Sequence, residues 1–267
     1  MEEKIFRSAK SMPVRIIESI EQDQSFNDMK KTQPLTNYND YITECIEKFI
    51  NSHFNFEELF TEQVYQFDIS RLYDLVIKKD EVLKCSPKSK EAKNIFAQMN
   101  DTIINPILKE IYEEYEKYKL YQDKYHYTYV VQNKEGMLTV VGKSSFKINN
   151  NDQKEIDNEN QGDLFEDISF WKNDINSIDD LDGTQHIEVA KYYIRKTGMN
   201  IDSEELDHFF KENKSMIKKY LRRLYKHAWV IPVKGDCKDA KKIEKYLGEY
   251  LLEQENIFIS NKDSHLI

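Results

Sequence analysis

Glycine, proline and cysteine are scarce in this chain. Only seven of the 267 residues are glycine and five are proline. This scarcity argues against barrels, propellers and glycine loops that hold phosphates, and it favours long regular helices. The three cysteines, Cys45, Cys85 and Cys237, lie far apart and show no CxxC spacing. They indicate neither a disulfide framework nor a metal site, so we expect reduced thiols, no metal and no cofactor.

The chain also lacks a long apolar run. No stretch approaches the roughly 18–20 apolar residues that a membrane-spanning helix needs. Residues 1–7, Met-Glu-Glu-Lys-Ile-Phe-Arg, have acids where a signal peptide has bases. We therefore expect a soluble, cytoplasmic protein without a membrane partner. The 14 Phe and 17 Tyr residues supply large side chains for a core.

The acidic charge is concentrated in one segment. Residues 151–182 contain eleven acids and two lysines, a balance of −9 that equals the net charge of the whole chain. Shortly afterwards, residues 211–226 contain seven bases and one acid, Glu212. An acidic segment and a basic helix so close in one chain can bind each other or bind two different partners.

Apolar spacing predicts helices before and after a β-hairpin. The ranges with helical spacing in the first half are 41–52, 68–79, 89–99 and 105–121. Residues 125–131 and 137–141 are β-branched and aromatic, and Gly136 ends the loop between them, which predicts a hairpin. In the C-terminal part, short helices are expected at 189–195, from 202, at 215–228 and at 239–252. Residues 230–233 contain Pro232 and are expected to form an edge strand or a loop.

These elements predict a predominantly helical α+β fold. We expect three regions: a helical domain ending in the hairpin at 1–148, an acidic linker or docking segment at 149–183, and a helical C-terminal domain at 184–267. Residues 149–163 are polar and without periodicity, which is typical of a loose or disordered linker. The acidic segment also contains apolar side chains that are candidates for docking a partner. They are Phe165, Ile168, Phe170 and Trp171.

On a continuous helix over residues 216–227, the side chains separate completely into an apolar and a cationic face. The apolar face has Ile217, Tyr220, Leu221, Leu224 and Tyr225. The cationic face has Lys218, Lys219, Arg222, Arg223 and Lys226. Three interpretations stay open: a solvated face, a contact with the chain's own acidic segment, or a site for a nucleic-acid backbone.

Arg222 and His227 are separated by four residues. This Arg-x4-His pattern resembles the active-site signature of HEPN-type ribonucleases. The resemblance implies paired helices that place Arg and His against an RNA phosphodiester, usually across a dimer, without a metal. On an ideal helix Arg222 and His227 lie 140° apart and Arg223 and His227 lie 40° apart. Arg222, Arg223 and His227 are therefore the candidate catalytic residues.

Two functions follow as hypotheses. The first is a non-enzymatic protein-interaction or regulatory protein that uses charge-complementary surfaces and whose partner is another protein. The alternative is a HEPN-like ribonuclease or nucleic-acid-binding protein centred on residues 211–227, with a homodimer as a further alternative. Lysine greatly outnumbers arginine, as in proteins of AT-rich genomes, which indicates a low-GC bacterium, its phage or a mobile element.

Overall fold

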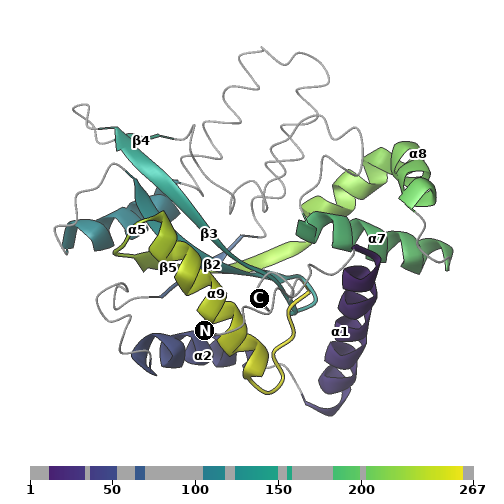
Figure 1. Cartoon of the computed structure of the whole chain (residues 1–267), viewed down its shortest axis with the longest axis horizontal. Coiled ribbons are helices and arrows are strands. Elements are labelled where there is room, and N and C mark those ends of the chain that lie inside the picture. The colour runs from purple at the N-terminus through teal and green to yellow at the C-terminus, as the bar shows by residue number, and fades with distance from the viewer. Residues whose placement is uncertain are drawn as a thin grey trace, which may run out of the picture.

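The computed structural model describes residues 12–33, 37–52, 64–69, 105–117, 124–149, 155–157, 183–198 and 203–260. The helices in these ranges are α1 (Met12–Thr32), α2 (Tyr38–Ser52), α5 (Asn105–Lys117), α7 (Gly183–Thr197), α8 (Ser203–Arg222) and α9 (Cys237–Glu253). The strands are β1 (Tyr65–Asp68), β2 (Tyr125–Asn133), β3 (Leu138–Asn149), β4 (Glu155–Asp157) and β5 (Tyr225–Val233). The predicted class is confirmed: the fold is α+β and rich in helix (Figure 1).

The predicted hairpin is the centre of the sheet. Strands β2 and β3 pair antiparallel, from Tyr125 opposite Phe146 to Gln132 opposite Leu138. Gly136 has φ 104°, a conformation that glycine adopts without strain, as the loop composition predicted. The Asn133 Oδ1 accepts hydrogen bonds from the backbone N–H groups of Glu135 and Met137, each at 3.0 Å, and so closes the turn.

Strand β5 occupies an inner position that the sequence did not predict. The strand order is β1-β5-β2-β3-β4, and β5 pairs antiparallel with both of its neighbours. The expectation of an edge strand or loop at 230–233 is wrong, because these residues end a nine-residue strand. Residues 1–148 and 184–267, expected as separate domains, both contribute strands to this one sheet.

Pro232 is tolerated in β5 because the neighbouring strand β1 does not pair as far along β5 as this residue. The Ile69 N–H donates to the Lys226 carbonyl, so the even-numbered residues of β5 turn their backbone groups toward β1. Strand β1 pairs only with residues 227–230. Pro232 lies beyond that stretch, so its missing N–H removes no hydrogen bond to β1.

Helices cover both faces of the sheet, which explains why every residue of β2 is buried. Tyr127 and Tyr129 belong to a core that includes side chains of α5, α7 and α8. The alternate residue Val130 and the fully buried Trp229 belong to a second core, formed with α2 and α9. Figure 1 shows α9 lying across the sheet with α2 beside it. Burying each large side chain stabilises the fold by about 1.5–3 kcal/mol, so both layers hold the sheet in place.

Several predicted helices are present with shifted ends. Helices α2, α5 and α9 overlap the ranges 41–52, 105–121 and 239–252, and α7 extends the expected 189–195 in both directions. Helix α9 begins with a capping box, in which the Asp236 side chain accepts from the N–H groups of Lys238 and Asp239. None of the helices in the described ranges is both long and apolar enough to cross a membrane.

The acidic segment is described at one place only. Residues 155–157 form β4, which pairs with residues 147–149 of β3. The prediction of a linker without regular structure is therefore wrong at these three residues, where pairing with an existing strand outweighs a weak local preference. The rest of 150–182 lies outside the described residues, as do residues 70–79 of the helix expected at 68–79 and the whole helix expected at 89–99. Asp68, where the first of these was expected to start, ends β1 instead.

Candidate functional sites

Helix α8 has two halves that meet at Asn213. Its buried side chains recur at helical spacing and pack on the core: Leu206, Phe209, Phe210, Ile217 and Leu221. Asn213 has non-helical backbone angles (φ −111°, ψ 16°), and its side-chain Nδ2 donates to the Phe209 carbonyl at 3.0 Å. This side-chain hydrogen bond gives the Phe209 carbonyl a donor at the kink.

The charges of α8 are divided at the same point. The first half contains Glu204, Glu205, Asp207 and Glu212, with Lys211 as its one base. From Asn213 to Gly235 the sequence has seven bases and no acid. Acids near a helix N-terminus and bases near its C-terminus both suit the helix dipole. The dipole therefore accounts for part of the charge pattern, but not for the absence of every acid over 23 residues.

The second half of α8, the turn after it and the start of β5 form an exposed cationic region, which we call the basic surface. It consists of Lys214, Lys218, Lys219, Arg223 and Lys226. Lys219, Arg223 and Lys226 are exposed, and Lys214 and Lys218 are partly exposed. Because Ile217, Leu221 and Leu224 are buried on the opposite side, the cations project away from the core. Figure 1 shows α8 beside α7 on the right of the view, away from α2 and α9.

The predicted helix over 215–228 is wrong after Arg222. Residues 223 and 224 form a turn, whose N–H groups donate to the carbonyls of Tyr220 and Leu221 at 3.0 and 3.1 Å. The chain then enters β5 at Tyr225. The aromatic and β-branched residues from Tyr225 to Val233 fit a strand, and two neighbouring strands supply the pairing that overrides their helical spacing.

This change of structure places the candidate catalytic residues on three different elements. Arg222 ends α8, Arg223 lies in the turn, and His227 lies on β5 opposite Asp68 and Gln132. The expected placement of Arg223 and His227 one turn apart on a helix is therefore wrong. The half-buried His227 has its Nδ1 3.3 Å from the Phe67 carbonyl oxygen and its ring centroid 6.2 Å from that of Trp229.

The remaining sequence candidates are placed less fully. The docking candidates Phe165, Ile168, Phe170 and Trp171 lie outside the described residues. Within the part of the chain that the structure describes, no group of three or more His, Cys, Asp or Glu side chains is arranged to hold a metal ion. Cys45 is buried, and Cys237 is exposed at the start of α9.

A buried ionic network joins α1 to α7, and the sequence analysis missed it. The Lys191 side chain is 1% exposed. Its Nζ donates to Asp23 Oδ1 at 2.9 Å and to Glu188 Oε1 at 2.8 Å. It also lies 3.2 Å from Ser19 Oγ and 3.5 Å from Ser260 Oγ. Two carboxylates and two hydroxyls therefore surround one ammonium, which a buried charge requires.

Two further side chains extend this network toward the surface. Arg195, which is 46% exposed, donates through Nη2 to the second oxygen of Asp23. On the other side, the Tyr220 hydroxyl donates to Glu188 Oε2 at 3.4 Å and so connects the network to α8. Burial raises the pKa of the Asp23 carboxyl, and the charge of Lys191 opposes that rise. Burial and the nearby Glu188 raise the pKa of Tyr220, so this hydroxyl stays protonated and acts as a donor.

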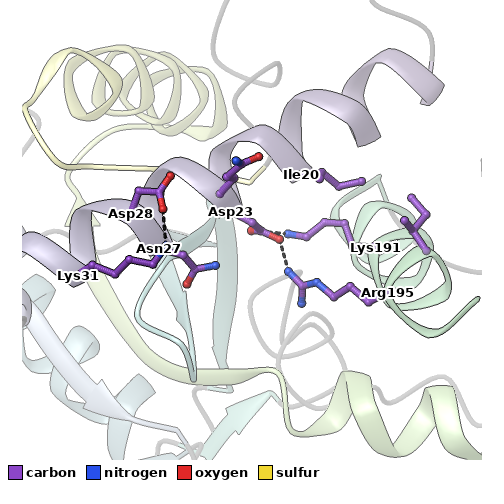
Figure 2. A pocket seen from close by; sticks show the side chains of 9 residues that line it. Ile20, Asp23, Asn27, Asp28, Lys31, Lys191 and Arg195 are labelled. Carbon is purple, nitrogen blue, oxygen red and sulfur yellow. Dashed lines mark hydrogen bonds and ion pairs between the residues drawn. The ribbon is translucent and has the colours of Figure 1, made fainter. Parts of the chain in front are cut away.

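A pocket of about 330 Å³ opens beside the network, between α1 and α7. Figure 2 shows Asp23 reaching from α1 toward Lys191 and Arg195 of α7, with the Asp28–Lys31 pair farther along α1. Polar residues at buried positions were the signal for this site. Ser19 and Asp23 occupy the same side of α1 as the buried Ile16 and Phe26, with spacings of three and four residues.

Comparison with protein-family models, with curated proteins and with solved structures finds no match to this chain.

Proposed function

We propose that this protein is a non-enzymatic interaction or regulatory protein that binds an acidic segment of another protein through the basic surface. The observation that carries the proposal is the run from Asn213 to Gly235 without an acid, whose exposed cations project from a helix anchored by its apolar side. A solvated helix face ordinarily mixes both signs of charge, because like charges at helical spacing repel one another.

Two features favour an acidic protein segment over a nucleic acid. The chain has a net charge of −9, which repels a long polyanion before contact. The basic surface also occupies only the last turns of one helix, the turn after it and the start of β5, which suits a short segment with a few carboxylates. The resemblance to a ribonuclease signature supports the alternative less than the sequence did, because Arg222 ends α8 and His227 lies on β5.

The test is a charge reversal with a matched control. The test variant changes Lys218, Lys219 and Arg223 to Glu, and the control variant changes Lys238, Lys241 and Lys242 of α9 to Glu. The test set lies on the end of α8 and the turn after it, and the control set lies on α9. Both variants change the net charge equally, so long-range repulsion is the same in the two. Circular dichroism establishes that both variants are folded.

Binding is measured by fluorescence anisotropy with a labelled Asp/Glu-rich peptide and, separately, with a single-stranded RNA. We expect the native chain and the control to bind the peptide at low salt, and the test variant to bind about tenfold more weakly, from three lost ion pairs. Equal affinities of the two variants would contradict the proposal. Binding of the RNA but not of the peptide, lost in the test variant, would replace it with nucleic-acid binding.

A further inference from the structure

The pocket between α1 and α7 combines a charged wall with an apolar one. From α1, its lining includes the side chains of Ile20, Gln24 and Asn27, and from α7 it includes Ile194 and Arg195. Arg195 lies at the edge of the buried network and is 46% exposed. A half-exposed guanidinium fixed by a buried carboxylate is a preorganised donor, because its position is already held before a ligand arrives.

Hydrogen-bond accounting shows that Arg195 has donors beyond the one that binds Asp23. Both oxygens of Asp23 already accept hydrogen bonds, one from Lys191 Nζ and one from Arg195 Nη2. Arg195 has five N–H donors, and its bond to Asp23 uses Nη2. The exposed amides of Gln24 and Asn27 on α1 offer both N–H donors and carbonyl acceptors. The guanidinium donors that Asp23 does not use fit a ligand that carries acceptors.

The charge and shape of the lining narrow the ligand further. The lining contains three cations, Lys31, Lys191 and Arg195, and two acids, Asp23 and Asp28. Lys191 is also paired with Glu188, and Lys31 is paired with Asp28, so the half-exposed Arg195 is the cation that a ligand can reach. One such cation matches one anionic group better than a polyphosphate. Ile20 and Ile194 supply an apolar wall, and 330 Å³ is at the small end of the range for ligand pockets.

We propose that the pocket between α1 and α7 binds a small organic anion, whose carboxylate or phosphate group accepts hydrogen bonds from Arg195 and whose short apolar part packs against Ile20 and Ile194. This site is independent of the basic surface and uses none of its cations. A cation is a poorer ligand, because Lys191 and Arg195 already neutralise Asp23.

The test is a nuclear magnetic resonance titration of the full chain with butyrate and, separately, with inorganic phosphate, at constant ionic strength set with chloride. We expect saturable shifts of the Arg195 side-chain N–H signals. Arg195→Gln should weaken binding at least about tenfold, because a charge-assisted contact is lost. The matched control, Lys196→Gln, changes the next residue on α7, which is exposed and lies outside the pocket lining, and should bind as the native chain does.

A second variant keeps the test valid if Arg195→Gln fails to fold. Asn27→Asp places a negative charge at an exposed position of the lining without touching the network, and it should also weaken binding. Binding of only one of the two anions supports the proposal and identifies the head group. The proposal is overturned if neither anion gives a saturable shift, or if Asn27→Asp binds as tightly as the native chain.

Discussion

The buried network and the basic surface both contain cationic side chains, but those of the network are buried with counter-charges and those of the basic surface are exposed or partly exposed. Lys191 is 1% exposed and is surrounded by Asp23, Glu188 and two hydroxyls. Lys219 and Lys226 are exposed, in a run of sequence without an acid. Charge that holds a fold together must be paired when it is buried, whereas charge that serves recognition must stay accessible to a partner.

The contrast teaches where each kind of substitution should act. In the network, removing one member leaves the others buried without a counter-charge, so the effect falls on stability. On the basic surface, water replaces a lost partner at little cost, so the effect falls on binding.

The largest effect is expected from Lys191→Met, which keeps most of the side-chain volume but leaves Asp23 and Glu188 without their shared cation. The free energy of unfolding should fall by about 3–5 kcal/mol. Urea denaturation followed by circular dichroism measures the loss. The control is Lys196→Met, at an exposed position of the same helix, which should change the free energy by less than about 0.5 kcal/mol. Similar losses in both variants would contradict the claim that the buried network stabilises the fold.

A smaller effect on stability is expected from the variant in which Lys218, Lys219 and Arg223 are changed to Glu. Negative charges near the end of α8 oppose the helix dipole, which should lower the free energy of unfolding by about 1–2 kcal/mol. The loss should shrink in high salt, because charges at the surface are screened. The loss in Lys191→Met should persist in high salt, because that network is buried. A salt-independent loss in the α8 variant would mean that these side chains act through packing instead.

The smallest effect is expected at His126, a buried group that titrates near neutral pH. Burial, with a contribution from Lys143, lowers the pKa of His126 below its ordinary value of 6.5. The unfolded chain then binds more protons than the folded one near this pH. The contribution of His126 to the free energy of unfolding is therefore fully present above pH 6.5 and is lost as the pH falls below that value. His126→Gln should remove part of this acid sensitivity. The measurement is the melting temperature at a series of pH values between 5 and 8, the range in which histidine titrates. His208→Gln, at a residue 73% exposed, is the control and should leave the profile unchanged.

Elements that depend on residues close together in the chain could be predicted from the sequence. The hairpin of β2 and β3 and the helices α2, α5 and α9 were predictable, because their spacing and their turn residue Gly136 act over a few neighbours. Strand β5 was not predictable in the same way. Its first residues continue the helical spacing of Ile217 and Leu221, and only pairing with β1 and β2, far away in the sequence, makes them a strand.

The two candidate sites differ in the same way, because one depends on neighbouring residues and the other on distant ones. The basic surface was visible in the sequence, because it depends on residues that are neighbours in the chain. The network was not, because its signal is polar residues at buried positions of α1, a helix that was not predicted. Asp23 and Lys191 are 168 residues apart in the sequence, and their contact follows only from the packing of α1 on α7.

The most direct test of the central claim is a map of amide chemical shifts in the full chain during titration with the Asp/Glu-rich peptide. If the basic surface is the binding site, the largest shifts should fall on residues 214–226. They should disappear in high salt, and the residues around Lys191 should change little. Shifts that cluster on another surface, or no shifts at low salt, would contradict the account.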